Sequence, residues 1–207
     1  NDYKGISLWV ADQNNNGGIR DLFVYNNTVF ADKGIAPSGG GVLFKSGGLH
    51  GVRFFNNIFY SRNGAPLVVA TDTTALGVSF QHNAYYSENG AYTFIWNENS
   101  YTLLEAFRQG TGQEAVNGNP TGITANPRLV APGTVGTLGH PLNLQKLRDR
   151  YSPQKKSPLL GKGIAPPLPK PFIPATHDIA GNKLNSAASP DMGAVAYTRP
   201  RWLRWLR

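Results

Sequence analysis

The stretch VRFFNNIFYSRNG at residues 52–64 occurs again in altered form, as LFVYNNTVFADKG at 22–34 and as VSFQHNAYYSENG at 78–90. In each copy a run of β-forming residues is interrupted by a polar pair and then resumes. The second residue of the pair is always an asparagine, and Asn27, Asn57 and Asn83 are 30 and 26 residues apart. A repeat of this length is typical of solenoid proteins, in which each repeat forms one coil.

A further strand-like run precedes each copy, at 5–12, 41–47 and 66–72, and a fourth follows the last copy at 92–98. These runs start at Ile6, Val42, Leu67 and Thr93, with spacings of 36, 25 and 26 residues. Several short strands in each repeat, with Gly or Asn at the bends and no helix between them, predict an all-β fold in which residues 1–99 form a parallel β-helix.

The polar pairs fall where the chain must bend between two strands of a coil. We expect the first residue of each pair to adopt the left-handed backbone conformation, which Asn and His tolerate. These residues are Asn26, Asn56 and His82. The asparagine that follows points inward, and the stacked amides of Asn27, Asn57 and Asn83 form a hydrogen-bonded ladder that satisfies buried polar groups. The alternative is three unrelated Asn-rich loops.

The pattern Val-x-Phe-x-Asn-Asn-x-Phe at 52–59 resembles the coils of secreted bacterial right-handed parallel β-helix proteins, the pectate-lyase-like group. The later segments resemble the C-terminal portion of such proteins; they are TLLEAFRQGTG at 102–112, ANPRLVAPG at 125–133, SPLLGKG at 157–163, HDIAGNKL at 177–184 and SPDMGAVAY at 189–197. The resemblance implies a right-handed β-helix, a secreted, cell-surface or periplasmic location and a carbohydrate-active role, although this scaffold also carries non-enzymatic proteins.

Beyond the coils, the sequence predicts three further parts. Residues 100–112 contain Leu103, Leu104, Ala106 and Phe107 at helical spacing, which predicts a short amphipathic helix capping the open end of the stack. Residues 113–197 are rich in Pro and Gly and are interpreted as an irregular extension packed on the solenoid, with a linker or disordered tail as the alternative. Residues 198–207 form a basic tail, RPRWLRWLR, which is either an anchor for an anionic surface or a frayed terminus.

Charge and composition narrow the range of partners. The formal net charge of the 207 residues is +8, and four of the positive charges lie in the last nine residues, so nucleic acid is not predicted as a partner. No apolar run is long enough for a membrane span. The chain begins at Asn1 without an initiator Met or signal peptide, and we expect upstream coils, on an N-terminal segment or a second chain, to cover the edge at Ile6.

Aromatic and cationic side chains on the outer face are candidates for polysaccharide binding. If Ile6 and Leu8 point inward, then Trp9 points outward, and the spacing places Lys45 and Trp96 in the same column. Indole rings can stack on sugars while the lysine neutralises an acidic polymer. The alternative is that both tryptophans pack beneath the extension.

Two sets of residues are candidates for catalysis. Asp72 and Glu98 occupy equivalent strand ends, and paired carboxylates of this kind serve retaining glycosidases. A lyase acting on uronic polysaccharides instead requires a base beside positive charge, which Lys45, His50 and Arg53 can supply. The alternative is that all five are solvated surface residues.

No cofactor is predicted. The stretch DQNNNG at 12–17 places Asp12, Asn14 and Asn16 as in the first half of a calcium-binding loop, but Phe23 stands where the terminal Glu of such a loop is expected. An Asn-rich turn explains the stretch equally well. The function predicted from the sequence is therefore a polysaccharide lyase or glycoside hydrolase to which this chain contributes scaffold and part of a substrate groove; the alternative is a non-catalytic polysaccharide-binding, adhesion or structural protein.

Overall fold

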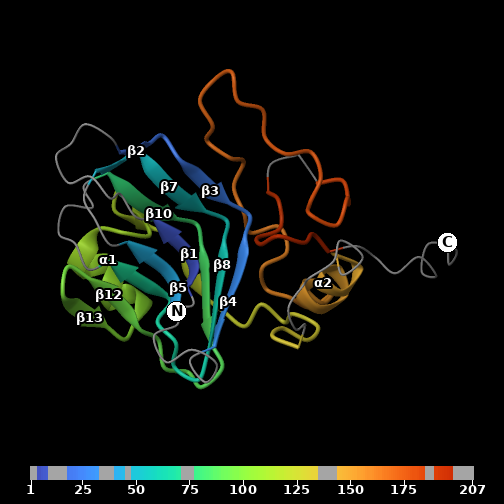
Figure 1. The fold of residues 1–207 in the computed structure, drawn as a ribbon, viewed down its shortest axis with the longest axis horizontal. Helices are drawn as coiled ribbons and strands as arrows, with labels where there is room; N and C mark the ends of the chain where they lie inside the picture. Colours follow the sequence, from blue (N-terminus) through green and yellow to red (C-terminus); the bar gives the residue numbers. More distant parts are fainter. Residues whose placement is uncertain are drawn as a thin grey trace, which may run out of the picture.

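The computed structural model of this chain describes residues 4–8, 18–32, 40–44, 48–70, 77–134, 144–184 and 189–197. Most of the described elements are short strands, gathered into several small and mainly parallel sheets that lie side by side (Figure 1). The prediction of a mostly-β fold is therefore confirmed.

Three sheets hold the main strands. The first consists of β1 (Lys4–Leu8), β5 (Gly40–Phe44), β9 (Val68–Ala70) and β12 (Phe94–Trp96), with β13 (Asn99–Tyr101) antiparallel at its edge. The second consists of β3 (Phe23–Tyr25), β7 (Val52–Phe55) and β10 (Val78–Gln81). The third consists of β4 (Thr28–Asp32), β8 (Ile58–Arg62), β11 (Ala84–Ser87) and β16 (Ile123–Thr124). Two short pairs complete the set, β2 (Ile19–Arg20) with β6 (Leu49–His50) and β14 (Ala115–Val116) with β15 (Asn119–Pro120).

The sequence repeat predicts the register of the second and third sheets. Val24 lies beside Phe54 and Phe54 beside Phe80 in the second sheet, at the offsets that the aligned copies predict. The rings of Phe54 and Phe80 stack at 4.6 Å between centroids and are almost fully buried. Val29, Phe59 and Tyr85 pair in the same way in the third sheet. The inward residues of successive repeats therefore form one continuous apolar core.

The asparagine column also has the predicted form. The backbone N–H and the side-chain amide of Asn27 both donate to Oδ1 of Asn57, at 3.0 Å. Asn57 donates in the same way to Oδ1 of Asn83, at 3.0 and 2.9 Å. Asn57 and Asn83 are fully buried, and their amides also donate to backbone carbonyls of the second sheet, so their polar groups are satisfied inside the core.

Each bend before this column has the predicted backbone. Asn26, Asn56 and His82 have φ values of 54°, 56° and 55°, in the left-handed region that a branched apolar residue would occupy only with strain. Such a bend turns the chain sharply from the second sheet into the third, which explains why the polar pair recurs at each copy.

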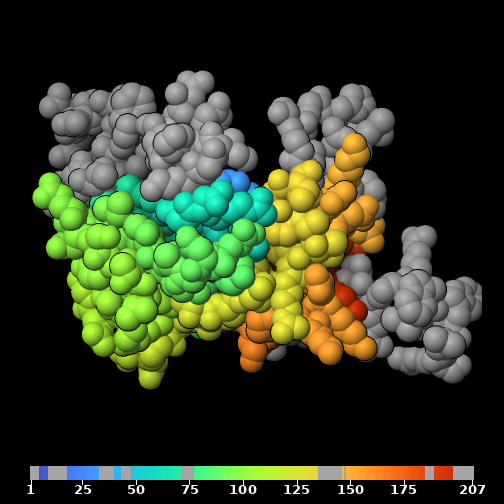
Figure 2. All heavy atoms as spheres, turned by 90° about the horizontal axis from the view of Figure 1, so that it is seen from below, coloured from blue at the N-terminus to red at the C-terminus, as the bar shows by residue number. Residues whose placement is uncertain are grey.

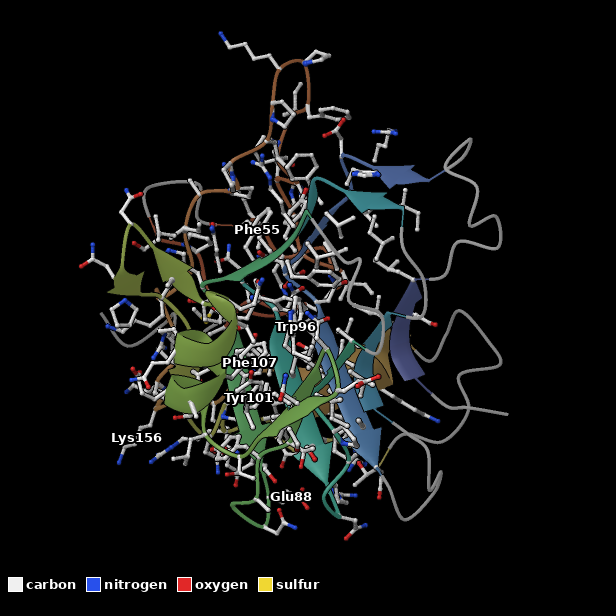
Figure 3. The ribbon with its side chains drawn as sticks, turned by 90° about the vertical axis from the view of Figure 1, so that its left-hand side faces the viewer. Phe55, Glu88, Trp96, Tyr101, Phe107 and Lys156 are labelled. Atoms are coloured by element: carbon white, nitrogen blue, oxygen red, sulfur yellow. The ribbon has the colours of Figure 1, made fainter. Side chains whose placement is uncertain are left out.

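A helix covers one end of the stacked strands, as the sequence predicts. Helix α1 (Leu104–Thr111) buries Leu104 and Phe107 on one face. Phe107 stacks on Phe94 at 4.7 Å and meets Trp96 edge-on at 5.9 Å. Figure 3 shows Trp96, Phe107 and Tyr101 gathered at this end of the molecule. Because Phe107 is fully buried, the helix closes the apolar core rather than lying loosely beside it.

The extension packs on the strands but is more regular than the sequence predicts. Its strand β16 pairs with β11, and it contains a helix, α2 (Leu144–Tyr151), that was not predicted. Leu159 and Met192 pack with Ile58 and Ala84 on the outside of the third sheet. In Figure 2 the yellow and orange surface of the extension lies directly against the green and cyan surface of the repeats. The basic tail, residues 198–207, lies outside the described residues.

One part of the predicted register is wrong. Phe44 lies beside Ala70, and Ala70 beside Trp96, so the offset from the second strand-like run to the third is 26 residues instead of the predicted 25. A shift of one residue moves every following side chain to the opposite face of a strand. Trp96 consequently points into the core, where it is 8% exposed and lies beside Phe80.

Candidate functional site

Two arginines and a histidine lie on neighbouring strands where the short β2–β6 pair meets the second sheet. Arg20 and His50 are cross-strand partners, and Arg53 follows three residues after His50. All three are exposed, because the residues next to them, Ile19, Leu49 and Val52, occupy the inward positions. We call Arg20, His50 and Arg53 the basic strip.

The bends between these strands hold the basic strip in place. Asp21 and Gly51 both have positive φ, and they separate the short pair from the second sheet. A Cβ atom at position 51 would lie 2.8 Å from Oδ1 of Asp21, so a glycine is required for the close approach. The strip therefore lies on the paired parallel strands β2 and β6 and on β7, which follows β6 directly, and backbone pairing fixes the position of each strand.

The positive charge of the basic strip is not neutralised within the described part of the chain. No carboxylate there forms an ion pair with Arg20, His50 or Arg53. Arg108, in contrast, pairs with Glu105 on helix α1. Charges left unpaired on a surface are available to an anionic ligand.

Arg62, on the outer face of the third sheet, is an arginine whose charge is neutralised by carboxylates. Arg62 donates to both carboxylate oxygens of Glu88, at 2.9 and 3.1 Å, and lies 3.8 Å from Asp32. The hydrogen bonds from Arg62 lower the pKa of Glu88, and burial raises the pKa of the Tyr60 hydroxyl that also donates to Glu88. The Arg62 guanidinium further donates to the carbonyl of Pro132, so this cluster fastens the extension to the third sheet.

Aromatic rings lie next to the basic strip on the same face. The guanidinium of Arg53 lies 5.6 Å from the centroid of the Phe23 ring, its cross-strand partner. Two residues further along, Tyr25 stacks on Phe55 at 5.2 Å with the rings almost parallel. Phe23 and Tyr25 are half-buried, whereas Phe55 is only 2% exposed. This combination of aromatic faces and unpaired cations suits a ligand that carries both apolar ring faces and negative charge.

A pocket of about 270 Å³ lies beyond Tyr25, between the first repeat and the extension. Its floor is formed by Tyr25, Asn26 and Asn27, and its far wall by residues 175–184 and 193–194 of the extension. Asp178 organises that wall, because its carboxylate accepts hydrogen bonds from the backbone N–H groups of Ala180, Asn182 and Ala196 and from the side-chain amide of Asn182. Neither the pocket nor Arg20 was identified from the sequence, since both depend on which strands become neighbours.

The other predicted site residues have different outcomes. Trp96 was predicted to face outward and bind substrate, and this is wrong because its indole is buried in the core. Glu98 is exposed and lies with Asn97 in the tight turn between β12 and β13. Its proposed partner Asp72 lies outside the described residues, so the carboxylate pair stays a prediction.

Several further predictions fall on residues that the structure does not describe. They are the substrate-binding residues Trp9 and Lys45 and the calcium candidates Asp12, Asn14 and Asn16. Among the residues that are described, no group of three or more His, Asp or Glu side chains gathers in a way that could hold a metal ion. No helix in the described ranges has the length and apolar character needed to cross a bilayer.

Glu114 is a buried carboxylate that was not identified from the sequence. It is fully buried at the end of the asparagine column, where Oε1 accepts from the Asn83 amide at 2.7 Å and from the Tyr85 hydroxyl at 2.8 Å. Its other oxygen accepts from Thr121 at 3.1 Å. Burial raises the pKa of Glu114 to about 7. Because α1 and the extension enclose it, Glu114 has a structural position rather than one open to a substrate.

No protein-family model matches this chain, and no curated protein matches it either. The assignment of function therefore rests on the geometry of the basic strip, the aromatic rings beside it and the pocket.

Proposed function

We propose that residues 4–101 form a right-handed parallel β-helix of the pectate-lyase-like kind, from a protein that is secreted or held at the cell surface. Two observations support this fold. Equivalent strands of successive repeats pair in parallel in all three main sheets, and a column of asparagine amides runs through the stack. An inward asparagine column of this type requires that each repeat lie directly on the previous one.

On this scaffold we propose that the chain binds an acidic polysaccharide along the basic strip. The observation that carries the proposal is the pair of unpaired guanidinium groups of Arg20 and Arg53 beside the half-buried Phe23 ring. A uronate residue has an apolar ring face and one carboxylate. The guanidinium groups can pair with successive carboxylates, and the aromatic face can stack on the ring between them.

The test is affinity electrophoresis through gels that contain polygalacturonate or, as a neutral comparison, dextran. We expect polygalacturonate to retard the protein and dextran not to do so. The double variant Arg20→Gln/Arg53→Gln should weaken retardation at least tenfold, since two charge-assisted contacts are lost. Added salt should weaken the binding of the unmodified protein, because exposed charges are screened.

A charge-matched control separates specific pairing from net charge. Lys155 and Lys156 are exposed on the extension, and Figure 3 shows Lys156 well away from Phe55 and the second sheet. The variant Lys155→Gln/Lys156→Gln removes the same charge and should keep its retardation. Equal losses in the two double variants would mean that the polymer senses only net charge, and the proposal would be wrong.

Lyase chemistry on the same strip is a second candidate function, favoured by the cross-strand pairing of His50 with Arg20. In β-elimination a base removes the proton from the carbon next to the carboxylate, and a carbon–carbon double bond forms as the bond from the neighbouring carbon to the glycosidic oxygen breaks. The leaving oxygen takes a proton from water. His50 is placed to accept the proton while Arg20 and Arg53 stabilise the negative charge that develops on the carboxylate.

The lyase candidate predicts ultraviolet absorbance from unsaturated uronate when polygalacturonate is incubated with the protein. Replacing His50 with Gln should abolish this absorbance and leave gel retardation unchanged. Retardation without any unsaturated product would support a binding protein and exclude the lyase candidate for this polymer.

A further inference from the structure

The bend residue of the second repeat shows what an asparagine at this position can hold. Asn56 is fully buried, and its side chain forms a two-point contact with one residue of the extension. Its amide nitrogen donates to the carbonyl of Ile164 at 2.7 Å, and its Oδ1 accepts from the N–H of Ile164 at 2.9 Å. The extension is thereby fixed to the outside of the bend by a donor and an acceptor from the same residue.

Asn26 occupies the same position one repeat earlier, but it forms no two-point contact like that of Asn56 with Ile164. The two bends have nearly identical backbones, with φ values of 54° and 56°. Oδ1 of Asn26 is nevertheless buried without any hydrogen-bond partner. Leaving such an acceptor unpaired destabilises the folded state, so a native structure usually provides a partner for it.

Asn26, whose Oδ1 is unpaired, belongs to the floor of the pocket described above. Around it, Tyr25, Ile179 and Leu184 supply aromatic and apolar surface, and Asn27 supplies a second amide. The cavity of about 270 Å³ lies near the lower limit of about 300 Å³ for small-molecule sites. It therefore has room for a single ring-sized group.

The contact at Asn56 also indicates which chemical group fits at Asn26. The N–H and C=O of one residue are joined through two carbon atoms, and hydroxyl groups on neighbouring carbons of a sugar ring are joined in the same way. One hydroxyl can donate to Oδ1 while the other accepts from the amide nitrogen. The apolar face of a sugar ring can lie against an aromatic ring such as that of Tyr25.

We propose that Asn26 and the pocket bind the adjacent hydroxyl groups of one sugar ring at the end of a polysaccharide chain. This inference rests on the proposed function and extends it, because Tyr25 lies two residues from Phe23 beside the basic strip. The strip takes the charged part of the polymer, and the pocket takes a terminal ring, since residues 175–184 close the far side.

The test uses neutral monosaccharides, which cannot respond to the cations of the basic strip. Methyl galactoside and methyl glucoside are titrated into ¹⁵N-labelled protein, and the side-chain amide signal of Asn26 is followed by NMR. We expect this signal to shift with saturable binding. The per-O-methylated glycosides keep their acceptors but lose their hydroxyl donors, and they should bind at least fivefold more weakly.

The variant Asn26→Asp keeps the shape and the left-handed backbone but replaces the amide donor with an acceptor. Asn26→Asp should weaken glycoside binding at least fivefold. Asn117→Asp is the matched control, because Asn117 is an exposed residue with φ of 50° in the turn between β14 and β15. It should bind the glycosides like the unmodified protein.

Three outcomes would overturn the inference. The first is that neither glycoside shifts the Asn26 signal. The second is that the methylated forms bind as tightly as the glycosides themselves. The third is that Asn26→Asp binds the glycosides as tightly as the unmodified protein does. N-acetylalanine methylamide provides the peptide comparison, since it offers the N–H and C=O of one residue. A shift with this compound and none with the sugars would assign the pocket to a peptide. Loss of polygalacturonate binding in the Arg20 and Arg53 variants is a separate readout, so the two proposals can fail independently.

Discussion

Asn57 shows how a single side chain can hold together three repeats of this fold. Its Oδ1 accepts two hydrogen bonds from Asn27, while its amide donates to Asn83 and to the carbonyl of Val24. An apolar residue of similar size would remove the hydrogen bonds that the Asn57 side chain makes to Asn27, to Asn83 and to the Val24 carbonyl. The column is therefore a specific feature of register, which a generally hydrophobic core would not provide.

Replacing Asn57 with Ala should strongly destabilise the protein. The backbone N–H of Asn27, the carbonyl of Val24 and Oδ1 of Asn83 would all lose a partner, and we expect the free energy of unfolding to fall by about 3 kcal/mol. Asn119→Ala, at an exposed position in β15, is the control and should change it by less than about 0.5 kcal/mol. Chemical denaturation measures both; similar small losses would show that the column contributes little.

Glu114 gives the fold a defined dependence on pH. Its pKa is raised by burial from 4.5 to about 7, so between these values the folded state holds a proton that the unfolded state has released. The free energy of unfolding therefore falls as pH rises through this window, by up to ~1.4 kcal/mol per pH unit. Below pH 4.5 both states are protonated and this contribution no longer changes.

The variant Glu114→Gln should remove this part of the pH dependence. Gln keeps an oxygen for the Asn83 and Tyr85 donors and places an amide towards Thr121. Relative to the unmodified protein, the variant should gain stability as pH rises from 5 to 8, by ~3 kcal/mol in total. Unfolding free energies at several pH values measure the difference, and a difference that does not vary with pH would contradict the assignment.

Helix α1 is the element that determines whether the end of the stacked strands stays closed. Its ring at position 107 contacts Phe94, Trp96 and Tyr101, which come from the last two strands of the first sheet. Because an eight-residue helix is not stable alone in water, α1 depends on this burial, and the open core depends on α1.

Phe107→Ala should lower the free energy of unfolding by about 3–5 kcal/mol, as expected for a large cavity in a core. Leu103, which precedes the helix and is 62% exposed, provides the control, and Leu103→Ala should have little effect. Hydrogen exchange should also become faster in α1 and β12 of the Phe107 variant. If the two variants were equally stable, α1 would not form part of the core.

On the scale of the whole molecule, the extension is joined to the stacked strands by the pairing of β16 with β11, by the apolar packing of Leu159 and Met192, and by polar contacts. Three of the polar contacts are especially direct. The Asn56 side chain hydrogen-bonds to the backbone of Ile164, and the Arg62 guanidinium donates to the carbonyl of Pro132. The backbone N–H of Ala194 donates to the hydroxyl of Thr28. Two of these contacts use side chains of the second repeat. The extension therefore depends on the stacked strands for its position, and it forms the far wall of the pocket in return.

Asn56→Gly should loosen the extension without unfolding the strands. Glycine retains the positive φ of the bend but removes both hydrogen bonds to Ile164. We expect hydrogen exchange at 160–168 to become at least tenfold faster, while β7 and β8 keep their protection. Asn117→Gly, at an exposed bend, should change neither region. Equal effects throughout the chain would mean that the extension and the strands unfold as one unit.

The mostly-β fold could be predicted from the sequence alone, and so could the bends, the asparagine column and the capping helix. These features repeat along the chain or depend on nearby residues, so periodicity and local backbone preference are enough to predict them. His50 and Arg53 were predicted as lyase candidates from their chemistry, and both side chains are exposed.

Which of these residues lie together in space could not be predicted from the sequence. Trp96 lies in the core instead of on the surface because the register differs from the predicted one by one residue. Arg20 lies beside His50 because β2 and β6 pair. Glu114 and the pocket at Asn26 depend on how an irregular, Pro- and Gly-rich extension folds back over the strands. Such contacts join residues far apart in the chain and leave no period in the sequence, so packing and hydrogen bonding in three dimensions determine them.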